Sequence, residues 1–263
     1  MNELTGHLES LQSTNTGVAH TALPQHYFHP VKAETYLQKW PTASQPASFI
    51  CDDGKIYVVK CRHIGRGAYN DQIIARLGKL IGAPVGKPTI VDIPSDLVIT
   101  NPDISALPPG LAHGVEFIAD TSGRLNGIDL NGHLDNKLRF AKLAVLFGWL
   151  QGADVQFIYS TVEPKYVYSV DHGHFFPGGP PWTIASLQSA TAPQLYAPIV
   201  SALSLTKSEM SSAVSAVTAL TDQQISDCVS LVPPDWGVDA GEKVALTQYL
   251  IDRRGILPSL VLG

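Results

Sequence analysis

The alternation of apolar and polar positions is clearest after residue 47, where it predicts a β-hairpin. Two runs rich in β-branched and aromatic residues, 48–51 and 55–60, flank Asp-Asp-Gly at 52–54. Asp-Gly between two such runs is typical of a tight turn. The second run ends in Lys60, although such a strand is expected to be buried and an ammonium group is not. Lys60 is therefore either a phosphate-binding side chain in a cleft or a lysine that reaches solvent from a strand end.

Apolar residues at helical spacing predict a helix over 71–81, which Gly82 and Pro84 end. Asp71 opens this predicted helix. One interpretation is that its carboxylate pairs with Lys60 and holds the ammonium group towards a phosphate, as an acidic residue does in kinases. The other is that Asp71 only interacts favourably with the helix dipole in the first turn.

Two further strands are predicted at 87–93 and 114–118, joined by a proline-rich loop. The second half of the chain is mainly helical. It begins with a helix at 135–150, and a short strand at 166–170 then leads into a loop rich in glycine and proline. Later segments with helical periodicity and cap signals lie at 184–190, 193–205, 207–219, 222–231 and 239–254.

The predicted fold class is α+β, with a bilobal arrangement of a β-rich first lobe and a mainly helical second lobe. Residues 1–45 have weak periodicity and many Ser, Thr, His and Pro residues, so we expect a loosely structured leader with one short helix at 33–39. The first lobe is expected at 46–118. The hinge or linker and the helical lobe are expected at 119–263.

Two further aspartates flank a predicted hairpin. Asp154 follows the apolar helix, and Asp171 ends the next strand in the pattern Asp-x-Gly. Phosphoryl transfer needs two carboxylates, one to orient or deprotonate the attacking hydroxyl and one to hold Mg²⁺ against the phosphates. The alternative is that Asp171 ends its strand in an Asx-turn and Asp154 caps a helix. Together with Lys60 and Asp71, however, the two aspartates follow the order and the elements that a phosphotransferase requires.

These segments resemble the HipA-like kinase domain family over about residues 45–255. The resemblance is carried by Tyr57-Val58-Val59-Lys60, Asn70-Asp71, the stretch from Leu77 to Val85 and, most distinctively, Asp171-His172-Gly173-His174-Phe175-Phe176-Pro177-Gly178-Gly179. It implies a protein-kinase-like fold, similar also to that of phosphatidylinositol kinases. It also implies an ATP- and Mg²⁺-dependent phosphotransferase, in the first place a Ser/Thr protein kinase.

The resemblance implies roles for the residues that match the nucleotide-binding positions. Lys60 would contact the α- and β-phosphates and assist catalysis. Asp71 would be its carboxylate partner, where a glutamate is more usual. The backbone of Glu116, Phe117 and Ile118 would form the hinge that meets the adenine.

The resemblance also implies that Asp154 is the catalytic base and Asp171 the metal ligand. No asparagine follows Asp154, so the second metal position falls to Gln156. The turn at 52–54 is acidic and short, which makes it a poor phosphate cradle. Gly65-Arg66-Gly67 is an alternative source of anion contacts, or a plain loop.

Three other functions stay open. A pseudokinase that binds nucleotide or protein without chemistry is favoured by the missing asparagine and the acidic turn. A small-molecule or lipid kinase is suggested by the Asp-x-Gly pattern and the Phe-Pro that follows. A metal-dependent hydrolase would use His172 and His174. Whatever the function, Trp182 would either gate a substrate groove downstream of Asp171 or only pack its loop.

Charge and composition narrow the set of partners. The net charge is −5 without a Lys/Arg cluster, which argues against a dedicated nucleic-acid binder. Three cysteines without metal-ligand spacing suit the cytoplasm, and no apolar run approaches the ~20 residues that span a bilayer. We therefore expect a cytoplasmic protein without nucleic-acid or membrane partners, and the resemblance implies ATP and a protein substrate. An antitoxin-like partner stays open.

Overall fold

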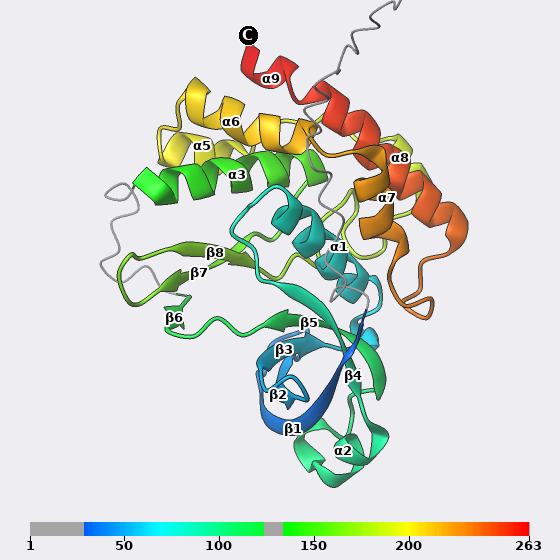
Figure 1. Ribbon diagram of the computed structural model, residues 1–263. Coiled ribbons are helices and arrows are strands. Elements are labelled where there is room, and N and C mark those ends of the chain that lie inside the picture. The colour runs from blue at the N-terminus through cyan, green and yellow to red at the C-terminus, as the bar shows by residue number, and fades with distance from the viewer. Residues whose placement is uncertain (1–28, 124–133, 263) are drawn as a thin grey trace, which may run out of the picture.

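The computed structural model describes residues 29–123 and 134–262 (Figure 1). The strands are β1 (Val31–Lys39), β2 (Ala47–Cys51), β3 (Ile56–Lys60), β4 (Pro88–Ile93), β5 (Gly110–Glu116), β6 (Thr121–Ser122), β7 (Gln156–Ser160) and β8 (Val167–Val170). The helices are α1 (Arg66–Leu80), α2 (Ser95–Thr100), α3 (Leu134–Leu150), α4 (Ile184–Gln188), α5 (Ala197–Ala202), α6 (Lys207–Thr218), α7 (Asp222–Ser230), α8 (Ala240–Ile256) and α9 (Ser259–Leu262), with 3-10 turns η2 (Arg62–Ile64) and η3 (Pro102–Ile104). The mixed α+β composition confirms the predicted class.

The first part of the described chain is a closed five-stranded barrel in the order β1-β2-β3-β5-β4. The predicted hairpin is confirmed, because β2 pairs with β3 from Ala47↔Val59 to Ile50↔Ile56. The barrel closes through a parallel pairing of β1 with β4 at Val31↔Val91. Its interior is a hydrophobic cluster that includes Phe49, Val59, Val91, Ile93 and Ala112.

The predicted helix at 33–39 is wrong. These residues lie in β1, which pairs with β2 along its length, so the barrel begins at Val31 inside the predicted leader. Of the nine side chains of β1, only that of Ala33 is fully buried. Without a buried alternate face, the strand lacks the period-2 pattern by which sequence reveals strands. Residues 1–28 of the predicted leader lie outside the described part of the chain.

Helix α1 begins five residues earlier than predicted. It follows Gly65, whose φ of 57° is accessible to glycine at little cost, and its first turn contains Gly67. Because a helical glycine costs about 1 kcal/mol relative to alanine, this turn looks like a loop in the sequence. As a result Asp71 lies in the second turn of α1, and the interpretation that it only favours the helix dipole is wrong.

Strand β5 also differs from its prediction, beginning at Gly110 and ending at Glu116. Its interior contains Gly114, where a Cβ atom would lie 2.5 Å from Val91 Cγ2 on the neighbouring strand. The glycine thus permits close packing but interrupts the apolar pattern. The predicted proline-rich loop before β5 contains α2 and η3, and α2 packs against both β1 and η3.

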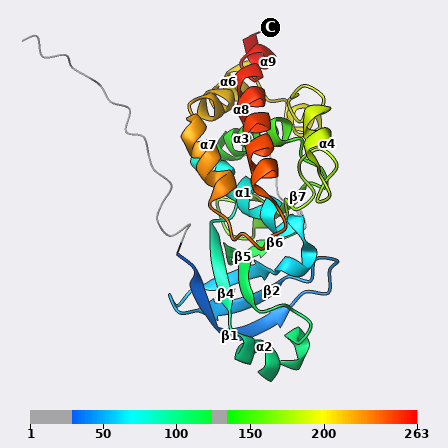
Figure 2. The same cartoon turned by 90° about the vertical axis from the view of Figure 1, so that its right-hand side faces the viewer.

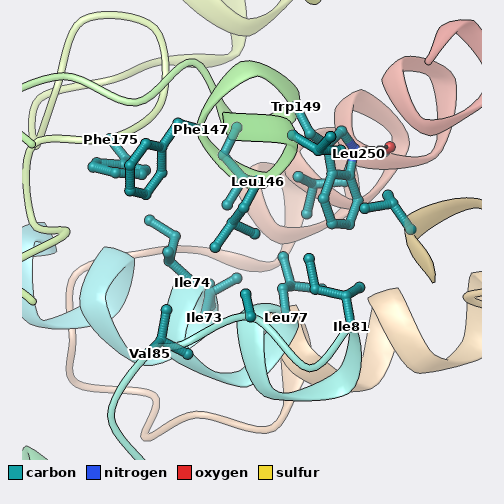
Figure 3. Close-up of a cluster of buried hydrophobic side chains, with 14 of the residues drawn as sticks. Ile73, Ile74, Leu77, Ile81, Val85, Leu146, Phe147, Trp149, Phe175 and Leu250 are labelled. Carbon is teal, nitrogen blue, oxygen red and sulfur yellow. Dashed lines mark hydrogen bonds between the residues drawn. The ribbon is translucent and has the colours of Figure 1, made fainter. Parts of the chain in front are cut away.

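The predicted helices of the second half are confirmed, and the short α9 follows them. A second hydrophobic core lies where α1 meets α3 and α8, and Figure 3 shows side chains of α1 facing those of α3. The labelled residues are Ile73, Ile74, Leu77, Ile81, Val85, Leu146, Phe147, Trp149, Phe175 and Leu250. A three-stranded sheet, β6-β7-β8, lies between this helical part and the barrel (Figure 1). Part of the predicted linker, 124–133, lies outside the described residues.

Barrel and helical part are also joined through the connection between α7 and α8 (Figures 1 and 2). Trp236 is buried, and its indole N–H donates to the carbonyl of Leu111 on β5 at 3.2 Å. Next to it, Arg62 of η2 pairs with Asp235 at 3.0 Å. The barrel is thus held to the helices at a point far along the chain from the segment that follows β5.

A bilayer-spanning helix is not present within residues 29–123 and 134–262.

Gly148 should be essential for the packing of α3. A Cβ atom there would lie 1.7 Å from the carbonyl oxygen of Gln194, a backbone atom that cannot rotate away. We expect Gly148→Ala to lower the free energy of unfolding by about 3 kcal/mol, since overpacking forces backbone shifts. Chemical denaturation measures this change.

The matched control is Gly255→Ala in α8, where the added Cβ atom meets nothing within 4 Å. Because alanine has the higher helix propensity, this variant should gain up to about 1 kcal/mol. Equal effects of the two substitutions would contradict the packing of residue 194 on α3.

Candidate functional site

A cavity of about 580 Å³ lies between the barrel and the sheet of β6, β7 and β8. Its walls come from β1, β3 and β5 on the barrel side, from α1 at the back, and from β7 and the end of β8 on the other side. This volume is in the range of small-molecule and cofactor sites. Of the predicted site residues, Lys60, Asp71, Glu116, Phe117, Ile118, Gln156 and Asp171 line the cavity, and Asp154 does not.

Lys60 lies at the end of β3 inside the cavity, not at a solvent-facing strand end. Its ammonium group bonds to Asp71 Oδ2 at 2.9 Å and also contacts Asp171 Oδ1. Lys60 and Asp71 are buried, while the Asp171 side chain remains 29% exposed. An isolated buried charge is costly, so each partner depends on the other.

The pKa values of the pair follow from this arrangement. Burial lowers the pKa of Lys60, but the negative charges of Asp71 and Asp171 outweigh burial and raise it above the ordinary value. Burial raises the pKa of Asp71, and the Lys60 ammonium group outweighs it and holds the pKa below the usual range. Both groups are therefore charged at neutral pH.

Helix α1 also fixes the loop that carries Asp171. The second carboxylate oxygen of Asp71 accepts the backbone N–H of His172 at 2.5 Å. Asn70 donates to the carbonyl of Gly173 at 2.8 Å and accepts the indole N–H of Trp182 at 3.0 Å. Trp182 is buried, so it packs this loop against α1 and does not gate a groove.

Asp171 has a left-handed backbone, with φ of 59°. Aspartate tolerates this region better than most residues, but the conformation still costs energy that the surrounding contacts must offset. The bonds from α1 to the loop supply those contacts. The local turn thus directs the Asp171 carboxylate towards Lys60.

Two buried histidines lie beside the ion pair. His172 shares a hydrogen bond of 2.8 Å between its Nε2 and Ser169 Oγ, and its Nδ1 is 3.7 Å from Asp71 Oδ1. His113 Nδ1 lies 2.6 Å from the side-chain amide of Gln72, which donates when oriented to satisfy all its neighbours. Burial lowers the pKa of both histidines to about 4, so both are neutral at pH 7.

The segment Glu116-Phe117-Ile118 forms one end of the cavity. The Glu116 side chain pairs with Lys55 at 3.2 Å on the surface, so only its backbone is directed at the interior. The N–H groups of Glu116 and Phe117 bond to Lys87 O and Ile56 O. The N–H of Ile118 has no such partner among the described residues.

Asp154 is exposed, with φ of 51°. Gln156 pairs with Val170 in the β7–β8 hairpin, so Asp154 and Asp171 lie beyond the same end of that hairpin. The Gln156 amide lies 3.4 Å from Asp154 Oδ2. Asp154 is therefore at the edge of the cavity entrance, and Gln156 stands between it and the interior.

Neither predicted source of anion contacts lines the cavity. The turn at 52–54 lies at the far end of the hairpin, where Asp53 accepts the hydroxyl of Tyr57 at 2.7 Å. Arg66 bonds to Glu242 at 2.7 Å and to the carbonyl of Trp182 at 2.7 Å, so it is held in place by the fold. The β1–β2 connection, residues 40–46, lines the cavity instead through Trp40, Thr42 and Pro46.

A histidine-based metal centre gains no support. His172 is buried and His174 is exposed, and the described residues contain no group of three His, Cys, Asp or Glu side chains that could hold a metal ion. The cavity does fit a magnesium–nucleotide complex. Magnesium is usually held by one or two carboxylates together with phosphate oxygens and water, and Asp171 presents such a carboxylate.

Several residues of the site were not found from the sequence. Ser169, His113 and Gln72 come from three elements, and only the fold brings them together. Trp40 was missed because β1 was missed. The signal that reveals it is the pair of prolines, Pro41 and Pro46, which mark the ends of a turn between two extended segments.

No protein-family profile and no curated protein matches this chain by sequence. Solved structures do match by fold. CtkA, a proinflammatory kinase of Helicobacter pylori, aligns with a TM-score of 0.55 and 10% identity over 89% of this chain and 98% of that chain. The golgi casein kinase aligns with a TM-score of 0.50 and 10% identity over 90% of this chain and 75% of its own.

Two further matches are more distant. The golgi casein kinase with Mn/ADP bound gives a TM-score of 0.46. HipA of Shewanella oneidensis MR-1, in a complex with HipB and operator DNA, gives 0.38 at 13% identity over 86% of this chain and 62% of that chain. CtkA and the golgi casein kinase are both kinases, so the likeness confirms the predicted kinase-like fold.

Removal of the Asp71 charge should destabilise the fold. Asp71→Asn leaves Lys60 buried with one carboxylate partner and weakens the bond to His172. We expect the free energy of unfolding to fall by about 3 kcal/mol, as for other broken buried ion pairs. Urea denaturation gives the value, and Asp96→Asn on the exposed face of α2 serves as the control, with a change below about 0.5 kcal/mol. Equal effects would contradict the burial of the Lys60–Asp71 pair.

Because of the two buried histidines, we expect the fold to lose stability already at pH values above those at which carboxylates titrate. Their folded-state pKa of about 4 lies below the unfolded value near 6.5, so the unfolded chain binds more protons between these limits. Stability should therefore decrease as pH falls from about 6.5 to 4, by about 1.4 kcal/mol per pH unit for each histidine. His113→Gln should remove the contribution of one histidine to this slope, about 1.4 kcal/mol per pH unit. An unchanged slope would show that His113 is not buried in its neutral form.

Proposed function

We propose that this chain is an ATP- and Mg²⁺-dependent phosphotransferase, in the first place a HipA-like Ser/Thr protein kinase, with barrel and helical part as its two lobes. One observation carries the proposal: a buried Lys60–Asp71 ion pair lies inside a nucleotide-sized cavity and contacts Asp171. A fold that is stabilised by apolar packing has little reason to bury these charges unless they serve a ligand.

The nucleotide would lie along β3. The adenine would meet the free N–H of Ile118 and neighbouring carbonyls, next to Tyr57, which pairs with Glu116. Lys60 is at the other end of the strand, about 10 Å from Tyr57 at 3.3 Å per residue. That distance suits a base at one end and phosphates at the other, with Asp71 directing the Lys60 ammonium group towards them.

Asp171 would hold Mg²⁺ together with phosphate oxygens, and Gln156 would supply a second oxygen ligand. The metal ion would neutralise phosphate charge. Asp154 would accept the proton of the attacking Ser or Thr hydroxyl from the entrance side, where an acceptor protein has access. Its exposed position suits a residue that meets a substrate from solvent.

The second candidate is a pseudokinase that binds nucleotide without transferring phosphate. It is favoured by the position of Asp154, which is exposed and does not line the cavity. A small-molecule or lipid acceptor is the remaining alternative for the substrate. A cytoplasmic location, which rests on the three cysteines without metal-ligand spacing, and an antitoxin-like partner also belong to the proposal.

Three variants separate nucleotide binding from phosphate transfer. Mg·ATP should raise the melting temperature of the wild type, because ligand at a hundredfold its Kd adds about 2.7 kcal/mol of stability. Asp171→Asn should lose the magnesium-dependent part of the shift, and Lys60→Met should weaken it. Asp154→Asn should keep the full shift and lose at least a hundredfold in phosphate transfer to a protein acceptor.

Thermal shift and transfer of labelled γ-phosphate are the two measurements. Asp252→Asn on the exposed surface of α8 is the control and should behave as wild type. Absence of a shift at millimolar Mg·ATP would refute the proposal. A normal shift without transfer by the wild type to any acceptor would favour the pseudokinase.

A further inference from the structure

The β1–β2 connection, residues 40–46, differs from a phosphate-binding loop in composition. It contains two prolines and no glycine. The N–H of Trp40 bonds to Pro46 O at 2.9 Å, and that of Gln45 bonds to Thr42 O at 3.0 Å. Four of its seven positions therefore have no backbone N–H to offer a ligand.

Trp40 differs from the other three tryptophans of the chain. Trp149, Trp182 and Trp236 are buried, and their indole N–H groups donate to Leu250 O, Asn70 Oδ1 and Leu111 O. Trp40 is half-buried and lines the cavity. Its indole N–H has no hydrogen-bond partner within the described ranges. It is thus an unused donor on a large aromatic surface at the ligand cavity.

The strand register places Trp40 at the Lys60 end of the cavity. Lys39 pairs with Ala47, and Ala47 pairs with Val59, so the connection extends past Val59 towards Lys60. The segment 116–118 is at the opposite end of β3. Trp40 therefore belongs to the region of the Lys60, Asp71 and Asp171 charges.

We propose that Trp40 is a ligand-binding residue that covers the phosphate end of the nucleotide and donates its indole N–H to a phosphate oxygen. The side chain thereby replaces backbone N–H groups that the proline-containing connection lacks. A planar, rigid ring loses little conformational entropy when it binds a ligand. A hydrogen bond from an N–H group to an anionic oxygen is stronger than one between two neutral groups. This inference rests on the proposed nucleotide site.

Trp40→Phe tests the inference, because it keeps an aromatic ring and removes the N–H. The ligands are Mg·ADP and adenosine, which share the base and ribose and differ in the phosphates. We expect Trp40→Phe to weaken Mg·ADP binding about tenfold, as the loss of one charge-assisted hydrogen bond requires. Adenosine binding should not change. Equal weakening of both ligands would place Trp40 at the base and overturn the proposal.

Intrinsic fluorescence provides a second readout. Mg·ADP should change the tryptophan emission of the wild type with saturation, and this change should be absent in Trp40→Phe. The matched control is Trp149→Phe, which removes a tryptophan of the helical core outside the cavity and should retain the change. If Trp40→Phe keeps both the emission change and the wild-type affinity, the role of Trp40 is refuted. Failure of the wild type to bind ADP in thermal shift would instead refute the nucleotide site itself.

Discussion

The buried carboxylate of Asp71 is the constraint on which the site depends. One of its oxygens bonds to Lys60 on the barrel, and the other accepts the N–H of His172 in the loop after β8. A single side chain on α1 thus connects a barrel strand to the loop that carries Asp171. Because the group is buried and charged, neither bond can be replaced by water, so the three segments keep their relative positions.

Helix α1 contacts both the helical core and the residues of the site. On one face, Ile73, Ile74 and Leu77 pack into the helical core (Figure 3). On another, Asn70 and Asp71 bond to the 171–182 loop and to Lys60. Because the helix is rigid, its packing in the core also fixes the positions of Asn70 and Asp71 at the cavity. Arg76, further along α1, donates to the carbonyl of Leu231 after α7 at 2.6 Å, so the helix is fixed at both ends.

Sequence reasoning was most successful where local rules and tertiary packing agree. The hairpin of β2 and β3 was predicted because Asp-Gly separates two runs of buried strand formers, and α3 because its apolar periodicity is strong. The pairing of Lys60 with Asp71 was anticipated from phosphotransfer chemistry. The loop contacts could not be predicted, because the bond of Ser169 to His172 spans Asp171, whose left-handed backbone the sequence does not reveal. Strand β1 has only one fully buried side chain, so its sequence lacks the strand pattern and β1 was not predicted. Trp40, which directly follows β1, was therefore not predicted as a site residue either.

The barrel is joined to the rest of the molecule at several separated points. The chain passes from β3 into α1, returns from α1 into β4, and leaves the barrel again from β5 towards β6 on the left in Figure 1. The contact of Trp236 with Leu111 adds a further link from the connection between α7 and α8. The cavity lies between parts that are tied together on several sides. Its width is therefore set by the fold as a whole, and hinge-like opening or sliding of the barrel would strain several links at once.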